Sequence, residues 1–200
     1  PTVVGGPYAT SEPHLLEDAD YLVIGEGEDT IAGFCAAFEA GGAPRITQNA
    51  ERPDVTLTPV PRYDLLRKDA YYNMSLQYSR GCPFSCEFCD IIVTFGRRPR
   101  TKRPEQVIEE LDEMRRVGFY SCFIVDDNFI GNKKDAKALL RLIIPWQQKH
   151  GYPLRLTTEA SVNLADDAEL LDLLYQANFR SVFIGIETPR EASLNETKKY

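Results

Sequence analysis

The sequence predicts an α/β protein whose larger part is a parallel sheet covered by helices, and three observations support this. From residue 73 onward, apolar strand-like segments alternate with amphipathic helical segments. A proline-rich stretch separates this part from an earlier pattern of two strands and a helix. The chain has 200 residues, 43% hydrophobic and 26% charged, which is ordinary for a globular protein. Such alternation forms either a doubly wound sheet or a barrel.

Four strands and three helices are expected in this larger part. Helix 104–117 places Val107, Leu111 and Met114 on one face. Helix 166–177 begins with a capping-box pattern from Asp166 to Glu169. The remaining elements are the helix at about 133–150 and the strands at 72–79, 121–127, 154–160 and 180–187.

Residues 1–42 are expected to end a separate α/β unit, because "TVVGG" and "DYLVIGEGE" indicate strands and "DTIAGFCAAFEAGG" a helix. Residues 43–72 contain four prolines and little apolar periodicity, so they are expected to form an extended linker. The second domain is then 73–200. The chain has a formal net charge of −7, yet residues 1–42 contain no Lys or Arg. Because both ends interrupt a pattern, we expect a fragment of a longer protein.

Several function classes are disfavoured by composition. No run of about 18 apolar residues and no signal peptide is present, so the sequence predicts a cytoplasmic protein without a transmembrane segment. The basic run "GRRPRTKR" is either a solvated loop or a contact for an anionic ligand. Nucleic-acid binding is disfavoured because the chain is acidic and this run lacks aromatic residues.

Three of the five cysteines lie within "CPFSCEFC": Cys82, Cys86 and Cys89. Clustered cysteines in a reducing compartment favour metal binding or redox chemistry. A structural zinc site needs four ligands, and Cys35 and Cys122 are interpreted as small buried thiols in a helix face and a strand. An iron–sulfur cube on three cysteines instead leaves one iron open. Zinc and an electron-transfer ferredoxin remain the alternatives.

Carboxylates lie at the carboxyl ends of three of the expected strands: Asp126 and Asp127, Glu159, and Glu187. Ligands of parallel α/β folds bind at the carboxyl ends of the strands, so these side chains are expected to surround one site with the cysteines. Each carboxylate taken alone could instead be a helix cap.

The spacing Cys82-x3-Cys86-x2-Cys89, with Phe88 before the last cysteine, resembles the cluster motif of the radical S-adenosylmethionine (SAM) enzymes. The resemblance implies a [4Fe-4S] cluster whose open iron binds SAM, and a partial (β/α)6 barrel of which residues 73–200 are the first four β/α units. It also implies that Asp126 or Asp127 contacts the methionyl amino group, that Glu187 lies near the ribose or methionine, and that Glu159 lines the cavity.

"VVGGPYATSEP" followed by "DYLVIGEGEDT" is similar to the closing part of a Rossmann-like cobalamin-binding domain. This resemblance implies that residues 1–42 are the C-terminal remnant of such a domain. Gly5 and Gly6 would let the backbone approach the nucleotide tail of cobalamin closely.

Four segments together, including "TEASVNLADD" and "VFIGIETP", resemble the hopanoid C-2 methylase branch of class B radical SAM proteins. The resemblance implies a 5'-deoxyadenosyl radical and cobalamin-dependent methylation of an unactivated carbon in a small-molecule or lipid substrate. It also implies an electron donor such as flavodoxin or ferredoxin, and a lipid substrate would bring the protein to a membrane surface. A radical rearrangement, cyclisation or oxidation, and a non-catalytic metal-binding module, are the alternative functions.

Overall fold

The structure is a computed structural model that describes residues 1–49 and 51–198. The chain divides into two compact units. The first unit comprises residues 1–58 together with the short segment 93–95, and the second comprises residues 59–92 and the chain from 96 onward.

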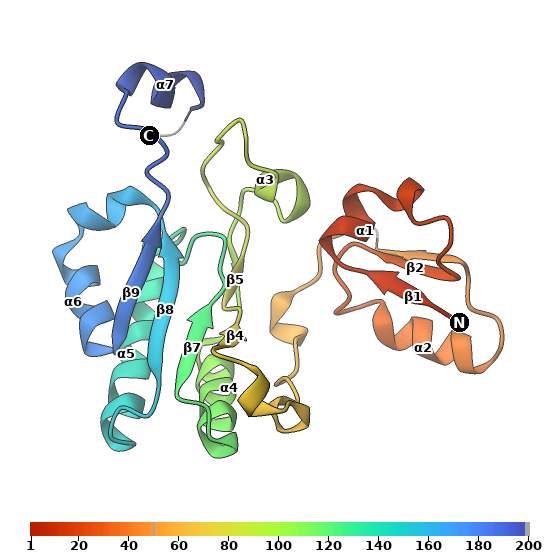
Figure 1. Ribbon diagram of the computed structural model, residues 1–200, viewed down its shortest axis with the longest axis horizontal. Helices are drawn as coiled ribbons and strands as arrows, with labels where there is room; N and C mark the ends of the chain where they lie inside the picture. The colour runs from red at the N-terminus through yellow and green to blue at the C-terminus, as the bar shows by residue number, and fades with distance from the viewer. Residues whose placement is uncertain (50, 199–200) are drawn as a thin grey trace. The chain divides into compact units, whose positions relative to one another are not determined.

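The second unit contains a four-stranded parallel sheet in the order β4-β7-β8-β9 (Figure 1). These strands are β4 (Met74–Leu76), β7 (Ser121–Ile124), β8 (Arg155–Ala160) and β9 (Phe179–Ile184). Helices α4 (Pro104–Val117), α5 (Lys133–Lys149) and α6 (Ala168–Gln176) connect them in sequence, and α7 (Glu191–Glu196) follows β9. The predicted α/β class, with four β/α units, is confirmed.

One face of this sheet is buried against the helices, and the other is more open. Along β7 and β8, Cys122, Ile124 and Leu156 are fully buried, whereas the alternating residues Thr157 and Glu159 are half-buried. Successive strand residues point to opposite faces. Helix α5 supplies fully buried Leu139 and Ile143 to the core, each worth about 1.5–3 kcal/mol of burial. The open face is therefore available for a site.

The helix boundaries agree with the sequence pattern, with one correction. Helix α4 begins at Pro104 and is capped after Val117 by Gly118, whose φ of 93° is the left-handed conformation that favours glycine. Helix α6 is capped by Asp167, which accepts a hydrogen bond from the Leu170 amide at 3.1 Å. The predicted cap at Asp166 is wrong by one residue, because Asp166 ends a 3-10 helix, Val162–Asp166, that precedes α6.

The first unit contains a parallel sheet in the order β1-β2-β3. Its strands are β1 (Val3–Gly5), β2 (Tyr21–Ile24) and β3 (Ile46–Gln48), and its helices are α1 (Pro7–Ser11) and α2 (Ile31–Glu39). The expectation that residues 43–72 contain no regular element is wrong here, because β3 lies within them. A three-residue strand is too short for a period-2 pattern to be visible. Further 3-10 helices in the chain are Pro13–Leu15, Val55–Leu57, Tyr63–Leu65 and Lys68–Ala70.

Helix α2 packs through aromatic side chains rather than through its cysteine. Phe34 is buried, and its ring meets the ring of Tyr21 on β2 edge-on, with 5.6 Å between centroids. Cys35 follows Phe34, about 100° further around the helix, and is exposed. The interpretation of Cys35 as a buried thiol is therefore wrong, whereas Cys122 is buried as expected.

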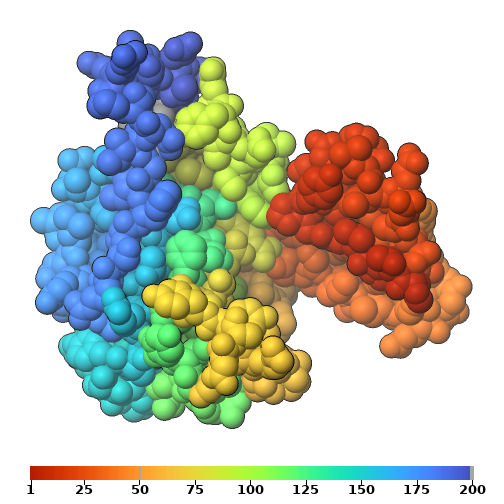
Figure 2. All heavy atoms as spheres, viewed as in Figure 1, coloured from red at the N-terminus to blue at the C-terminus, as the bar shows by residue number. Residues whose placement is uncertain are grey.

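Strand β9 lies at one edge of the described sheet, paired with β8. Phe183 and Ile186 are 65% and 63% exposed, and Figure 2 shows the blue atoms of this last part of the chain on the surface. Within the described residues, no helix has the length and apolar character needed to cross a membrane.

Candidate functional site

The three clustered cysteines lie in a loop between two short antiparallel strands, β5 (Ser79–Arg80) and β6 (Arg100–Thr101). The Cys82 amide donates to the Gly96 carbonyl at 3.2 Å, which joins the beginning of the loop to its far side. A second bond, from the Cys89 amide to the Cys86 carbonyl at 3.2 Å, forms a turn between the other two cysteines. The loop therefore has a defined backbone.

The thiols of this loop suit a thiolate-bound cluster. All three are free and half-buried. Burial raises the pKa of the Cys82 thiol, and the nearby Cys89 and Cys86 raise it further, so the three lie in one electrostatic environment. Among the described residues, no three His, Cys, Asp or Glu side chains form a metal-binding group. Three thiolates are the ligand set of an iron–sulfur cluster that keeps one iron open.

Asp126 lies beyond the end of β7 and braces the residues that lead into the cysteine loop. Its carboxylate accepts hydrogen bonds from the amides of Tyr78 and Ser79, at 2.7 and 3.0 Å, and from the Ser79 hydroxyl at 2.7 Å. The side chain is 1% exposed. Burial raises the pKa of Asp126 to about 7, although the hydrogen bonds from Ser79 and Tyr78 oppose the shift. This buried carboxylate is saturated with protein donors.

The raised pKa of Asp126 gives a pH prediction. Between about pH 4 and pH 7 the folded protein holds a proton on Asp126 that the unfolded chain has lost. The free energy of unfolding should therefore fall as pH rises through this window, by at most about 1.4 kcal/mol per pH unit from this group. Urea titrations at several pH values, followed by circular dichroism, measure this slope. The Asp126→Asn variant should lose it, and equal slopes in both proteins would contradict the assignment.

Asp127 and Asn128 hold the cysteine loop itself. The Gly81 amide donates to the Asp127 carboxylate at 2.7 Å, and the Asn128 amide nitrogen lies 3.9 Å from the Cys82 sulfur. Asn128 also donates to the Ser161 hydroxyl at 3.1 Å beyond β8. The carboxyl ends of β7 and β8 are thus joined to the residue that carries the first thiol.

The turn after Asn128 also fits closely against the cysteine loop. A Cβ atom on Gly131 would lie 3.2 Å from Cδ of Pro83 and 3.3 Å from Cγ of Pro99. A glycine therefore allows the closest approach of these segments.

The other predicted site residues are placed as follows. Glu159 is half-buried on the open face of β8, and its backbone carbonyl accepts from the Phe129 amide at 3.0 Å. Glu187 is exposed beyond β9 with a φ of 63°, which is unusual for a residue with a side chain. The structure thus joins Asp126 and Asp127 to the loop by direct hydrogen bonds and places Glu159 in the strand next to β7.

Gly5 and Gly6 lie in the first unit, after β1, and are glycines for different reasons. A Cβ atom on Gly5 would lie 3.2 Å from the Val23 carbonyl of β2, so the neighbouring strand requires a small residue there. Gly6 has a φ of 93°, and its missing Cβ faces open space. Gly6 is the one whose backbone a ligand could approach.

The basic run contains a buried ion pair that neither sequence interpretation foresaw. Lys102 is 5% exposed and its Nζ lies 2.5 Å from Oε1 of Glu110, which is 1% exposed. The Tyr63 hydroxyl donates to the other Glu110 oxygen at 3.4 Å. Glu110 is three residues from Val107, on the buried face of α4. A charged residue on an otherwise apolar helix face indicates a buried partner of opposite charge, and this signal was available in the sequence. The pair connects the chain that follows the cysteine loop, just after β6, to α4.

Comparison with known proteins identifies the family. Residues 76–200 match the family model described as the radical SAM superfamily. The chain belongs to the radical SAM superfamily.

Two curated relatives align with nearly the whole of this chain. An uncharacterized methyltransferase of Synechocystis sp. is 56% identical over 98% of this chain. The hopanoid C-2 methylase of Rhodopseudomonas palustris is 41% identical over 100% of it. The chain spans 37% and 39% of the lengths of these two relatives.

A solved structure shares the fold. The radical SAM methyltransferase TsrM from Kitasatospora setae, described with a tryptophan substrate and a SAM analogue bound, superposes with a TM-score of 0.81 at 24% sequence identity. The alignment covers 100% of this chain and 45% of TsrM. The predicted partial radical SAM fold is confirmed by this similarity.

Proposed function

We propose that this protein binds a [4Fe-4S] cluster through Cys82, Cys86 and Cys89, and methylates an unactivated carbon with SAM and cobalamin. The observation that carries the proposal is the three-thiol loop held at the carboxyl ends of β7 and β8 by Asp127 and Asn128. When bound, the cluster supplies the electron that cleaves SAM. The cysteines bind it, and the surrounding side chains orient the loop.

Within this proposal, Asp127 rather than Asp126 contacts SAM. Asp126 is 1% exposed and accepts three hydrogen bonds from protein groups. Asp127 is half-buried and follows β7 at the same end as the cysteine loop. A carboxylate here would bind the positively charged amino group of the methionyl moiety. Glu159 and Glu187 are proposed to line the same cavity.

Replacing Asp127 by Asn tests this assignment. The variant keeps an oxygen that can accept from the Gly81 amide, but it loses the charge that would bind the amino group. SAM affinity, measured by titration calorimetry on the reconstituted protein, should fall about tenfold to a hundredfold. The control is Asp172→Asn on α6, where the carboxylate accepts from the exposed Gln176 side chain. Equal affinities in both variants would contradict the role of Asp127.

Methyl transfer is supported by the two relatives named as a methyltransferase and a methylase, and cobalamin by a second structure of TsrM, described with cobalamin and a [4Fe-4S] cluster bound. The proposal assigns residues 1–42 to a cobalamin-binding domain, with the open backbone at Gly6 as the point of close approach. A lipid or other small-molecule substrate of hopanoid type is favoured because one relative is named a hopanoid C-2 methylase. An electron donor such as flavodoxin or ferredoxin would reduce the cluster.

Product analysis separates methylation from other radical reactions. The protein, reconstituted anaerobically and supplied with reductant, SAM, hydroxocobalamin and a hopanoid lipid, should form S-adenosylhomocysteine together with 5'-deoxyadenosine. The first product comes from SAM used as a methyl donor, and the second from SAM used as a radical source. Formation of 5'-deoxyadenosine alone would overturn methyl transfer and favour a rearrangement, cyclisation or oxidation.

A further inference from the structure

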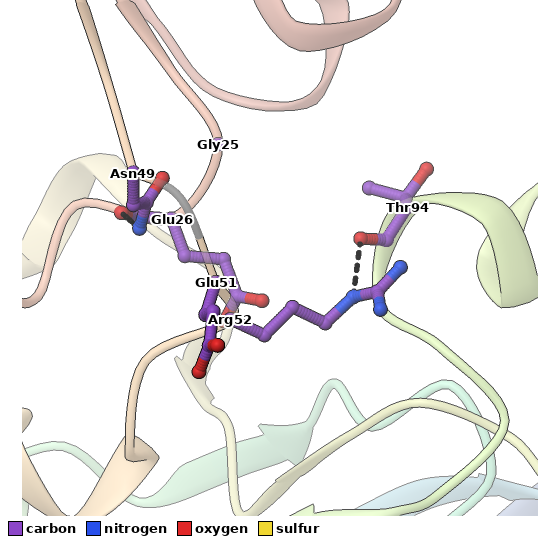
Figure 3. A pocket seen from close by; sticks show the side chains of 6 residues that line it. All are labelled: Gly25, Glu26, Asn49, Glu51, Arg52 and Thr94. Carbon is purple, nitrogen blue, oxygen red and sulfur yellow. Dashed lines mark hydrogen bonds between the residues drawn. The ribbon is translucent and has the colours of Figure 1, made fainter.

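Helix α3 (Ile91–Thr94) begins two residues after Cys89, and its last carbonyls are bound by an arginine from a distant part of the sequence. Arg52 donates from Nη2 to the Val93 carbonyl at 2.8 Å and from Nε to the Thr94 carbonyl at 3.3 Å. Figure 3 shows the Arg52 side chain extended toward Thr94. The final carbonyls of a helix have no partner within it, so a cation here supplies the missing donors.

Two backbone hydrogen bonds connect this helix to the cysteines. The Gly96 amide donates to the Ile91 carbonyl at 3.2 Å, and the Cys82 amide donates to the Gly96 carbonyl at 3.2 Å. Residues 91–96 therefore close the loop that carries all three thiols. A shift at the end of α3 would move Gly96 and with it the amide of Cys82.

Arg52 also lines a pocket of about 470 Å³ within the first unit. The pocket lies just beyond the carboxyl ends of β2 and β3. Asn49 donates to the Glu26 carbonyl at 2.6 Å and to the Asp29 carboxylate at 3.0 Å. Its side chain occupies the space where a Cβ on Gly25 would stand, 2.2 Å from Asn49 Oδ1. The lining residues are Gly25, Glu26, Asn49, Glu51, Arg52 and Thr94 (Figure 3).

We propose that Arg52 is a positioning residue that holds the cysteine loop closed for the cluster. The inference rests on the proposed function, because it assumes that Cys82, Cys86 and Cys89 bind a cluster. Arg52 touches none of the cysteines and acts through the carbonyls of Val93 and Thr94. A planar guanidinium can donate to both carbonyls at once, which a neutral amide of shorter reach cannot do.

The test compares Arg52→Gln with Arg45→Gln in the protein before and after reconstitution. Arg45 is a matched control, because its Nη2 also donates to a backbone carbonyl, that of Glu17, at 3.1 Å in the same unit. In the metal-free protein, hydrogen exchange of residues 91–97 should be roughly fivefold faster in Arg52→Gln than in the wild type. After reconstitution, iron release to a chelator should accelerate by a similar factor. Arg45→Gln should match the wild type in both.

The two measurements keep this inference separate from the proposed function. Unchanged exchange at 91–97 in Arg52→Gln would overturn it, as would faster exchange with unchanged iron release. An unfolding midpoint lowered equally by both substitutions, with no local difference at 91–97, would show a general structural role and also overturn it. A wild-type protein that takes up no cluster contradicts the proposed function instead, and the exchange result in the metal-free protein still stands.

Discussion

A Cys82→Ala variant is expected to lose the iron–sulfur cluster and, with it, all cleavage of SAM. The same result is expected for Cys86→Ala and Cys89→Ala, because the loop supplies three thiols and one missing ligand leaves too few for the cluster. Iron and sulfide analysis after anaerobic reconstitution measures the first loss. Chromatography of 5'-deoxyadenosine measures the second, which should fall to the background level.

The other two cysteines provide controls of opposite kinds. Cys35 is exposed on α2, so Cys35→Ala should change neither iron content nor stability. Cys122 is fully buried in β7, so Cys122→Ala should lower the free energy of unfolding by about 1 kcal/mol while the iron content stays normal. The assignment of the ligands would be wrong if either control lost its cluster, or if one of the three loop variants kept it.

Lys102→Met is expected to have the largest effect on stability of any single change considered for this chain. It leaves the buried carboxylate of Glu110 without its cation, and such broken pairs cost about 3–5 kcal/mol. Burial raises the pKa of Glu110 and the Lys102 charge opposes that shift, so removal of Lys102 should also favour a protonated Glu110. Urea unfolding followed by circular dichroism gives the free energy.

The double variant Lys102→Met, Glu110→Met separates the ion pair from its surroundings. Because both charges are removed together, most of the lost stability should return. The exposed pair of Arg116 and Glu113 on the same helix is the matched comparison, and Arg116→Met should change the free energy of unfolding far less. A single Lys102→Met variant as stable as the double variant would contradict a buried, charged pair.

The sequence predicted those parts of the molecule that depend on local patterns. The helix at 104–117 could be located because Val107, Leu111 and Met114 recur at helical spacing on one face, a pattern that lies within the helix itself. The cysteine motif and the strand-end carboxylates could be named for the same reason. The carboxyl ends of parallel strands meet at one edge of a sheet, so Asp126 and Asp127 could be placed beside the loop.

Features that depend on contacts between distant residues could not be predicted. Strand β3 is recognisable only through its pairing with β2, since three residues carry too little pattern. The contact of Arg52 with Val93 and Thr94 spans about forty residues, and nothing local to "ERPD" indicates it. Asp126 and Asp127 look equivalent in sequence. Only their different burial and hydrogen bonds show that Asp126 supports the backbone before the loop, whereas Asp127 is the candidate for ligand contact.

The most direct test of the central claim is the metal content of the anaerobically reconstituted protein, measured together with its electron paramagnetic resonance spectrum before and after SAM is added. The account predicts about four irons and four sulfides per chain. It also predicts that SAM changes the spectrum of the reduced cluster, because the iron without a cysteine ligand binds it. One tightly bound zinc per chain, no uptake of iron and sulfide, and no response to SAM would contradict the account.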